Sequence, residues 1–290
     1  MIFTMNGKKS DAATDGRTMG DILAELDERA EAAGEIIIEV RMDGKSLKPD
    51  ELADASNMAA SGKGLVELVA EPAADMKARA LETLLELVGN TTEALESGDA
   101  DSAIAARDAW ADYERSFAGL FSAEEGSFFD AFADRLKIGT TSPRSEMRQL
   151  AATLATFFGE RLAELRDPAG AMLASARIFD AIQADLSEVP VRLQTGKDAQ
   201  AMHTVVLAIE LINKMVRIMP EYMRTLSTAP IEVGGATMPE YYGALTGVLK
   251  ELAEAFENKD GVLIGDLAEY EIRPRLASFF QVVRTATVDA

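Results

Sequence analysis

A pair of amphipathic helices joined by a tight polar corner most constrains the fold of this chain. The pair spans Leu249 to Phe280, and its corner is Asn258-Lys259-Asp260-Gly261. Similar corners occur at Ser97-Gly98-Asp99 and at Gly196-Lys197-Asp198. In each we expect a left-handed cap at Gly or Asn, followed by an Asp that caps the return helix. Because the corners are unequally spaced, they predict an antiparallel helical bundle with internal duplication rather than a regular solenoid.

Residues 73–290 carry apolar side chains at helical intervals, which predicts an all-α domain. The clearest stripes are Leu81, Leu84, Leu85, Val88 and Leu95; Ala103, Ala106, Trp110, Tyr113, Phe117 and Leu120; and Met147, Ala151, Leu154, Phe158, Leu162 and Leu165. Two adjacent rows, Val205-Ile209-Ile212-Val216-Met219-Met223 and Leu211-Met215-Ile218-Tyr222, predict a helix at the centre of its bundle. Phe121, Phe128, Phe129 and Phe132 precede an expected loop over 139–143, and a second loop is expected before Pro239. Pro190 predicts a kink or a short break.

Residues 1–72 predict a separate α+β domain, because strand and helix patterns alternate there. Asn6-Gly7 and Asp43-Gly44 are turn signals. Thr18 with an Asp three residues later predicts a capped helix that ends near Gly34. Alternation of Ile36, Ile38 and Val40 with the residues between them predicts a strand with one better buried face, and a last strand ends at Pro72.

The order of MNGKK, the TMGDILAEL helix, IIEVRMDGKSLKPDEL and GLVELVAE resembles a β-grasp domain. Residues 1–71 are most similar to the ubiquitin-like sulfur carriers of thiamin and molybdopterin synthesis. Those carriers end in a free Gly-Gly tail, whereas here the last strand runs into Glu71-Pro72 and the chain continues. The resemblance therefore implies a docking or scaffolding β-grasp module, without sulfur-carrier activity.

Composition excludes several classes of function. A formal net charge of −20 disfavours nucleic acid and anionic membrane surfaces as partners, although it also suits a basic protein partner. The chain has no cysteine, and its single histidine, His203, lies on a mixed helix face, so thiolate chemistry and multi-histidine zinc sites are excluded. No secretory signal or membrane-spanning run is recognised, so Asn90-Thr91-Thr92 is not read as a glycosylation site. We expect a cytoplasmic protein of bacterial type, with no cofactor and no metal.

One polar cluster is a candidate site: Asp266, Glu269, Tyr270, Glu271 and Arg273. Helical spacing brings Asp266, Glu269, Tyr270 and Arg273 to neighbouring positions, and paired carboxylates divide acid and base roles when their surroundings separate their pKa values. The structural interpretation is a network in which Glu269 pairs with Arg273 and Tyr270 bonds across the bundle. Pro274 cannot donate to the Tyr270 carbonyl, so an Arg or a water is expected there.

Three classes of function follow. The favoured one is a non-enzymatic protein–protein interaction protein, with a sheet edge or face on the β-grasp module and a groove for a helix on the bundle. The hairpins resemble those of flagellin export chaperones and of uncharacterised bacterial helical proteins, which implies a flagellar or secretion-linked chaperone or adaptor. The alternative is an enzyme that uses Asp266 and Glu269, with or without a divalent metal. A third is a structural homo-oligomer.

Overall fold

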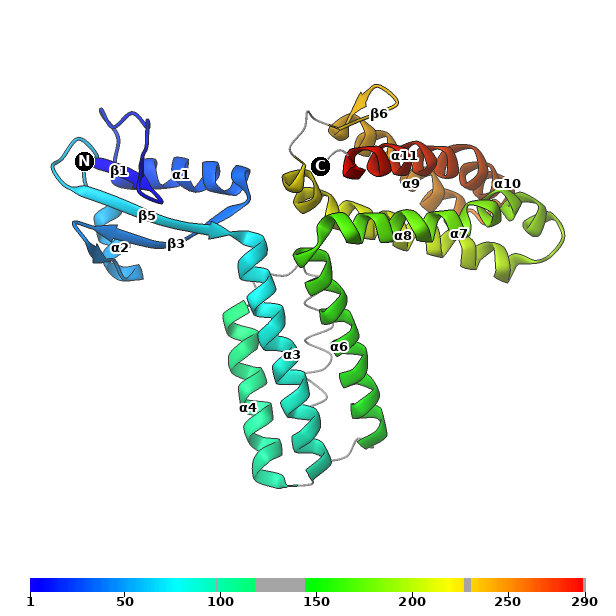
Figure 1. The fold of residues 1–290 in the computed structure, drawn as a ribbon, viewed down its shortest axis with the longest axis horizontal. Coiled ribbons are helices and arrows are strands. Elements are labelled where there is room, and N and C mark those ends of the chain that lie inside the picture. Colours follow the sequence, from blue (N-terminus) through cyan, green and yellow to red (C-terminus); the bar gives the residue numbers. More distant parts are fainter. Residues whose placement is uncertain (98, 118–143, 227–230, 289–290) are drawn as a thin grey trace. The chain divides into compact units, whose positions relative to one another are not determined.

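The computed structural model describes residues 1–97, 99–117, 144–226 and 231–288 (Figure 1). A mixed sheet near the N-terminus is followed by a mostly helical chain, which confirms the predicted fold class. The chain divides into two compact units, Met1–Leu162 and Ala163–Ala290. The predicted domain boundary at residue 72 is the junction of strand β5 (Leu65–Pro72) with helix α3 (Ala73–Ser97), within the first unit, and it stays a prediction.

The sheet has five strands in the order β2-β1-β5-β3-β4. Strand β1 (Ile2–Met5) runs parallel to β5, while β2 (Lys8–Lys9), β3 (Glu35–Met42) and β4 (Lys45–Ser46) pair antiparallel with their neighbours. Both predicted turns are present, and their four residues, Asn6-Gly7 and Asp43-Gly44, have positive φ angles. The α+β character of this region is thus confirmed, and the β-grasp resemblance stays a prediction.

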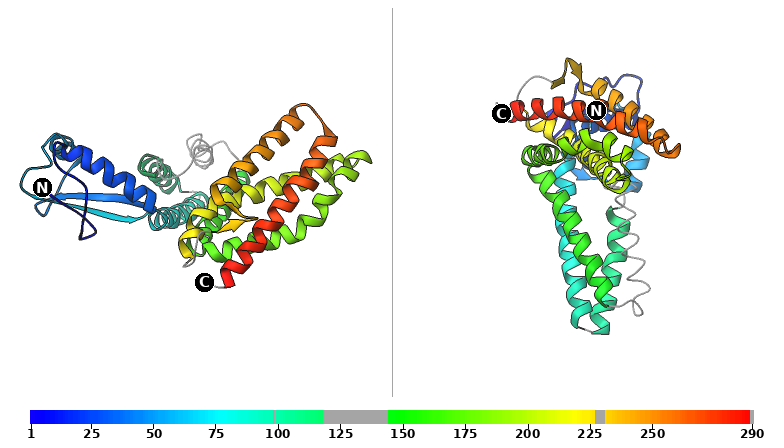
Figure 2. Two further views of the ribbon diagram at one scale, coloured as in Figure 1. Left: turned by 90° about the horizontal axis from the view of Figure 1, so that it is seen from above. Right: turned by 90° about the vertical axis from the view of Figure 1, so that its right-hand side faces the viewer.

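Helix α1 (Met19–Ala33) lies along one face of the sheet (Figure 2). The predicted capping box is formed, because the Asp21 amide donates to the Thr18 hydroxyl and the Asp21 carboxylate accepts from the Thr18 amide. The helix ends at Gly34, whose φ of 73° is left-handed. The short helix α2 (Pro49–Ser56) adds Ala55 to the same core. This core contains Phe3, Met19, Ile22, Leu26, Ala60, Val66 and Leu68.

The predicted alternation in β3 is wrong. The register of β3 against β5 shifts between Ile37 and Glu39, so Ile38 is an extra residue in the strand. A β-bulge of this kind reverses the side-chain parity beyond it. As a result Ile37, Val40 and Met42 pack against the core, while Ile38 is exposed.

Helices α3, α4 (Ala100–Phe117) and α6 (Arg144–Arg166) follow the sheet. The predicted stripes are buried at Leu81, Leu84, Val88 and Trp110, and at Ala151, Leu154 and Phe158. The Trp110 indole donates to the Thr91 hydroxyl at 2.8 Å, which links α4 to α3 inside the packed pair. The predicted phenylalanine-rich stretch at 121–132 and the loop at 139–143 lie outside the described residues.

The second unit packs α7 (Pro168–Gln194), α8 (Asp198–Thr225), α9 (Met238–Glu257) and the continuous segment α10 (Gly261–Asp266), η2 (Leu267–Ile272) and α11 (Arg273–Val288) around one core. Helix α8 contributes ten buried residues, which agrees with its predicted central position. Val216, expected in its apolar row, is exposed. Unlike the predicted all-α domain, this unit contains a small hairpin of β6 (Glu232–Val233) and β7 (Ala236–Thr237), turned by Gly234 and Gly235.

Two local predictions in this unit need correction. At the corner before α10 the left-handed residue is Lys259, not Asn258, although Asp260 caps α10 through the Leu263 amide as expected. At the other corner Gly196 is left-handed, but Lys197 occupies the cap position, and Asp198 begins α8. The predicted break at Pro190 does not occur, because α7 continues for four residues beyond it.

Candidate functional site

The predicted polar cluster lies on a wide helical turn. Segment η2 is a π-helix, in which the Arg273 amide donates to the Ala268 carbonyl, five residues back. Pro274 explains it: proline has no N–H, and in α geometry its ring clashes with the carbonyl four residues before, that of Tyr270. A π turn relieves this clash without breaking the helix. The cluster therefore lies on one continuous helical segment, formed by α10, η2 and α11.

The five predicted residues do not converge on a pocket of their own. Asp266 and Tyr270 are exposed, and Glu269, Glu271 and Arg273 are half-buried. The expected Glu269–Arg273 ion pair is not among those found in the described residues; Arg273 Nε instead donates to the Glu269 carbonyl at 3.4 Å. The ion pair forms two residues later, between Glu271 and Arg275.

The expected bond of Tyr270 across the bundle is also wrong, since its side chain is 62% exposed. Tyr270 instead interacts with acidic neighbours. The Glu269 carboxylate, with a smaller effect from Asp266, raises the pKa of the phenol, while Arg273 opposes the shift. Neither Asp266 nor Glu269 forms an ion pair with any described residue. In the same ranges no three His, Cys, Asp or Glu side chains gather closely enough to hold a metal ion.

Exposed apolar side chains surround this acidic stretch. Val262, Tyr270 and Val191 are 67%, 62% and 59% exposed, the highest values among large apolar residues in the described ranges. Val191 lies on α7, which packs closely against α10. A Cβ added to Gly265 would lie 2.9 Å from the Pro190 Cα. We name the surface of Val191, Val262, Asp266, Glu269 and Tyr270 the α7–α10 corner. Sequence patterns missed its two valines, which lie beside Pro190 and Gly261.

A second apolar surface lies on the sheet, on the face opposite α1. Strand parity places Ile2, Ile36, Leu65 and Val69 there, together with the bulged Ile38. Ile2 and Ile38 are 51% and 44% exposed, and the others are half-buried. Glu39, Arg41, Glu67 and Glu71 share this face. We name these five aliphatic residues the outer sheet face.

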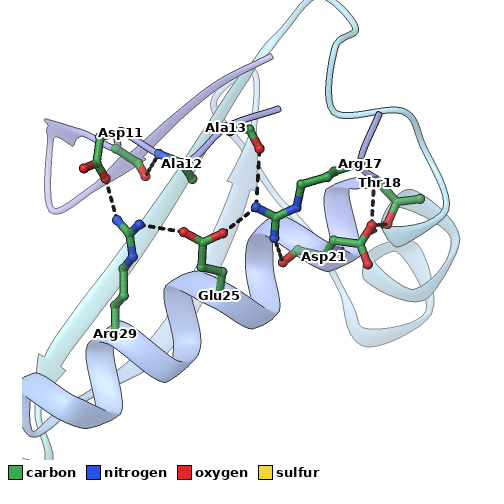
Figure 3. Close-up of polar contacts among 9 residues, drawn as sticks. Asp11, Ala12, Ala13, Arg17, Thr18, Asp21, Glu25 and Arg29 are labelled. Atoms are coloured by element: carbon green, nitrogen blue, oxygen red, sulfur yellow. Dashed lines mark hydrogen bonds and ion pairs between the residues drawn. The ribbon is translucent and has the colours of Figure 1, made fainter. Parts of the chain in front are cut away.

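The charged residues beside α1 satisfy one another, as Figure 3 shows. Arg17 and Arg29 both bind Glu25, and Arg29 also binds Asp11. The hydrogen bond from Arg29 holds the pKa of Asp11 below its usual value, and that from Arg17 does the same for Glu25. The network fastens the chain before α1 to the helix, so we interpret it as structural.

The hollow beside β1, the buried Glu164 and the single histidine are further candidate sites, and none of them is favoured. An open hollow of about 530 Å³ beside β1 is lined by Phe3, Lys9, Ser10 and Asp11, among others, but Asp11 is already bound to Arg29. In the second unit the buried Glu164 accepts both Arg217 Nε and Nη2, at 2.9 and 3.0 Å. His203 is exposed, as expected. Within the described ranges, no helix combines the length and hydrophobicity needed to cross a bilayer.

Comparison with known proteins gives two family matches. Residues 1–70 match a TP0873 N-terminal domain, and residues 174–282 match a domain of unknown function, DUF8042. The outer sheet face lies within the first segment and the α7–α10 corner within the second. No curated protein and no solved structure matches the chain.

Proposed function

We propose that this chain is a non-enzymatic protein–protein interaction protein, an adaptor that works in the cytoplasm. The outer sheet face is the main support. There Ile2 and Ile38 present aliphatic side chains to solvent, on the face of the sheet that α1 does not cover. Exposed apolar side chains beside a polar rim are typical of binding surfaces.

A side-chain contact on the face fits better than an added strand at the edge. The two edge strands, β2 and β4, are each two residues long and carry Lys8, Lys9 and Lys45. Short, lysine-bearing edges discourage pairing with another strand. Strand β4 pairs only with Arg41 and Met42 of β3, so residues 35–39 of β3 border no strand on that side among the described residues. We favour the sheet face because of its exposed aliphatic side chains, and strand addition along β3 is the alternative docking mode.

The alternative is an enzyme that uses Asp266 and Glu269, and it is favoured by the absence of ion-pair partners for these carboxylates among the described residues. Burial is what usually raises a carboxyl pKa for acid catalysis, and Asp266 is exposed. Calorimetric titration with Mg²⁺ and Mn²⁺ tests this alternative: binding that the double substitution Asp266→Asn, Glu269→Gln abolishes supports it. The chaperone role implied by the hairpin resemblance stays a prediction.

Site-specific photo-crosslinking in the native host tests the adaptor proposal. A photoreactive amino acid at Ile38 is expected to give one discrete adduct, which Ile2→Glu abolishes. The matched control is Glu28, exposed on α1, where no such adduct is expected. Equal labelling from positions 28 and 38 contradicts the proposal.

A further inference from the structure

We propose that the α7–α10 corner binds a basic segment of a partner protein, one that presents a Lys or Arg beside an aliphatic residue. The inference rests on the proposed interaction role, and it assigns a partner chemistry to a surface in the second unit. Three observations carry it: the alignment of exposed side chains, the two carboxylates without ion-pair partners among the described residues, and an exposed aromatic ring between them.

The corner residues share one side of the α7–α10 contact. A Cβ on Gly265 would meet Pro190, and one on Gly261 would meet Leu193 Cδ1 at 3.9 Å, so the two helices run antiparallel there. When two antiparallel helices touch, residues that follow the contact positions turn to the same side. Val191 follows Pro190, while Val262 and Asp266 follow the two glycines.

The π turn brings Tyr270 to this same side. An i→i+5 turn rotates the chain less per residue than an α turn does. Tyr270 therefore stays nearly in line with Val262 and Asp266 instead of moving round the helix. The effect of Glu269 and, to a smaller extent, Asp266 in raising the pKa of the Tyr270 phenol agrees with this placement.

The charge of the α7–α10 corner indicates which kind of partner binds there. Other carboxylates of this unit form ion pairs within the chain: Glu271 with Arg275, Asp180 with Arg284, and both Asp185 and Glu188 with the single Arg192. Asp266 and Glu269 have no ion-pair partner among the described residues. Arg273 adds one positive charge beside these two carboxylates, so the corner keeps a net negative charge on a chain of net charge −20. A second copy of the chain is repelled, whereas a cation is attracted.

The exposed ring adds specificity to this attraction. A Lys or Arg over a tyrosine face gains a cation–π contact, and tyrosine is frequent at positions that dominate binding energy. Val191 and Val262 provide the apolar contact that an aliphatic neighbour of the cation needs. This combination fits a basic, partly apolar segment better than a purely charged one.

The probe is a short helical peptide of arginine and leucine, labelled for fluorescence anisotropy and titrated with the full chain at physiological salt. Peptides with glutamate in place of arginine, or with serine in place of leucine, are the comparisons. We expect Tyr270→Ala to weaken binding of the arginine–leucine peptide about tenfold. Tyr270→Phe keeps the ring and is expected to stay within roughly threefold of the wild type.

Two further variants separate the corner from general attraction. Asp266→Asn and Glu254→Gln each remove one negative charge from an exposed position, but Glu254 lies on α9, outside the corner. We expect only Asp266→Asn to weaken binding. Equal loss in both, or unchanged binding in Tyr270→Ala, overturns the proposal. Crosslinking at Ile38 is independent of this result, so the two proposals fail separately.

Discussion

Gly265→Ala tests the close contact between α10 and α7. The added Cβ would lie 2.9 Å from the Pro190 Cα and 3.1 Å from its Cβ. These atoms belong to the backbone and ring of a proline inside a helix, so they cannot move aside without displacing α7. Overpacking of this kind costs about 1–3 kcal/mol.

Helix propensity acts in the opposite direction. Replacing a helical glycine by alanine stabilises by roughly 0.5–1 kcal/mol where space is free. The matched control is Gly247→Ala. Gly247 is an exposed position on α9, and a Cβ added there would meet nothing within 4 Å. We therefore expect Gly247→Ala to stabilise and Gly265→Ala to destabilise by about 1 kcal/mol, so the two differ by about 2 kcal/mol.

Urea unfolding followed by circular dichroism measures this difference. With a slope of roughly 2 kcal/mol per molar urea, the midpoints of the two variants should lie about 1 M apart. If Gly265→Ala raised the midpoint as much as Gly247→Ala does, the helices would not be in close contact, and the alignment of the α7–α10 corner would lose its basis.

Four further substitutions probe polar groups. Tyr242→Phe should stabilise the protein by about 1 kcal/mol, because the buried Tyr242 hydroxyl has no hydrogen-bond partner among the described residues. Tyr241→Phe should destabilise it by a similar amount, because the Tyr241 hydroxyl donates to the Arg275 carbonyl at 3.2 Å. Thr91→Val should cost about 1–3 kcal/mol, because it removes the hydroxyl that accepts the hydrogen bond from the Trp110 indole. Arg29→Gln should make the stability of α1 less sensitive to acid. The carboxylates that Arg29 binds, Asp11 and Glu25, have lowered pKa values in the folded chain. Their contribution to stability is therefore present at neutral pH and is lost as the pH falls through those values.

The readouts for these substitutions are equally direct. Chemical denaturation ranks the tyrosine and threonine variants, with Thr92→Val as the control for Thr91, because the Thr92 hydroxyl bonds only its own helix at Val88. Hydrogen exchange of the α1 amides between pH 7 and pH 3 follows Arg29→Gln. A wild-type α1 whose protection does not change over this range would contradict the structural role of the network. A destabilised Tyr242→Phe would indicate an unseen partner for that hydroxyl.

Local signals in the sequence predicted most elements. Thr18 with Asp21, Asn6-Gly7 and Asp43-Gly44 act within a few residues, so their geometry could be inferred without the rest of the chain. The bulge at Ile38 could not, because it depends on how β3 aligns with β5. The hairpin β6–β7 was missed because its strands are only two residues long.

The candidate cluster shows the same limit. Its five residues lie on one helical segment, as predicted, but the expected Glu269–Arg273 pair is not among the ion pairs of the described residues, and Glu271 pairs with Arg275 instead. Pro274 was the available signal, but it predicted only that the Tyr270 carbonyl lacks its helical donor, and the Arg or water expected there stays a prediction. The exposure of Val191 and Val262 depends on tertiary packing around Pro190 and Gly265, which no periodicity reveals.

The single tryptophan has a practical consequence. Trp110 is buried between α3 and α4, in the first compact unit, whereas Tyr222, Tyr241, Tyr242 and Tyr270 all belong to the second. Emission excited at long wavelength reports only on the first unit, whereas the second unit holds four of the five tyrosines and no tryptophan. An unlabelled sample can thus reveal whether the two units melt together or one after the other.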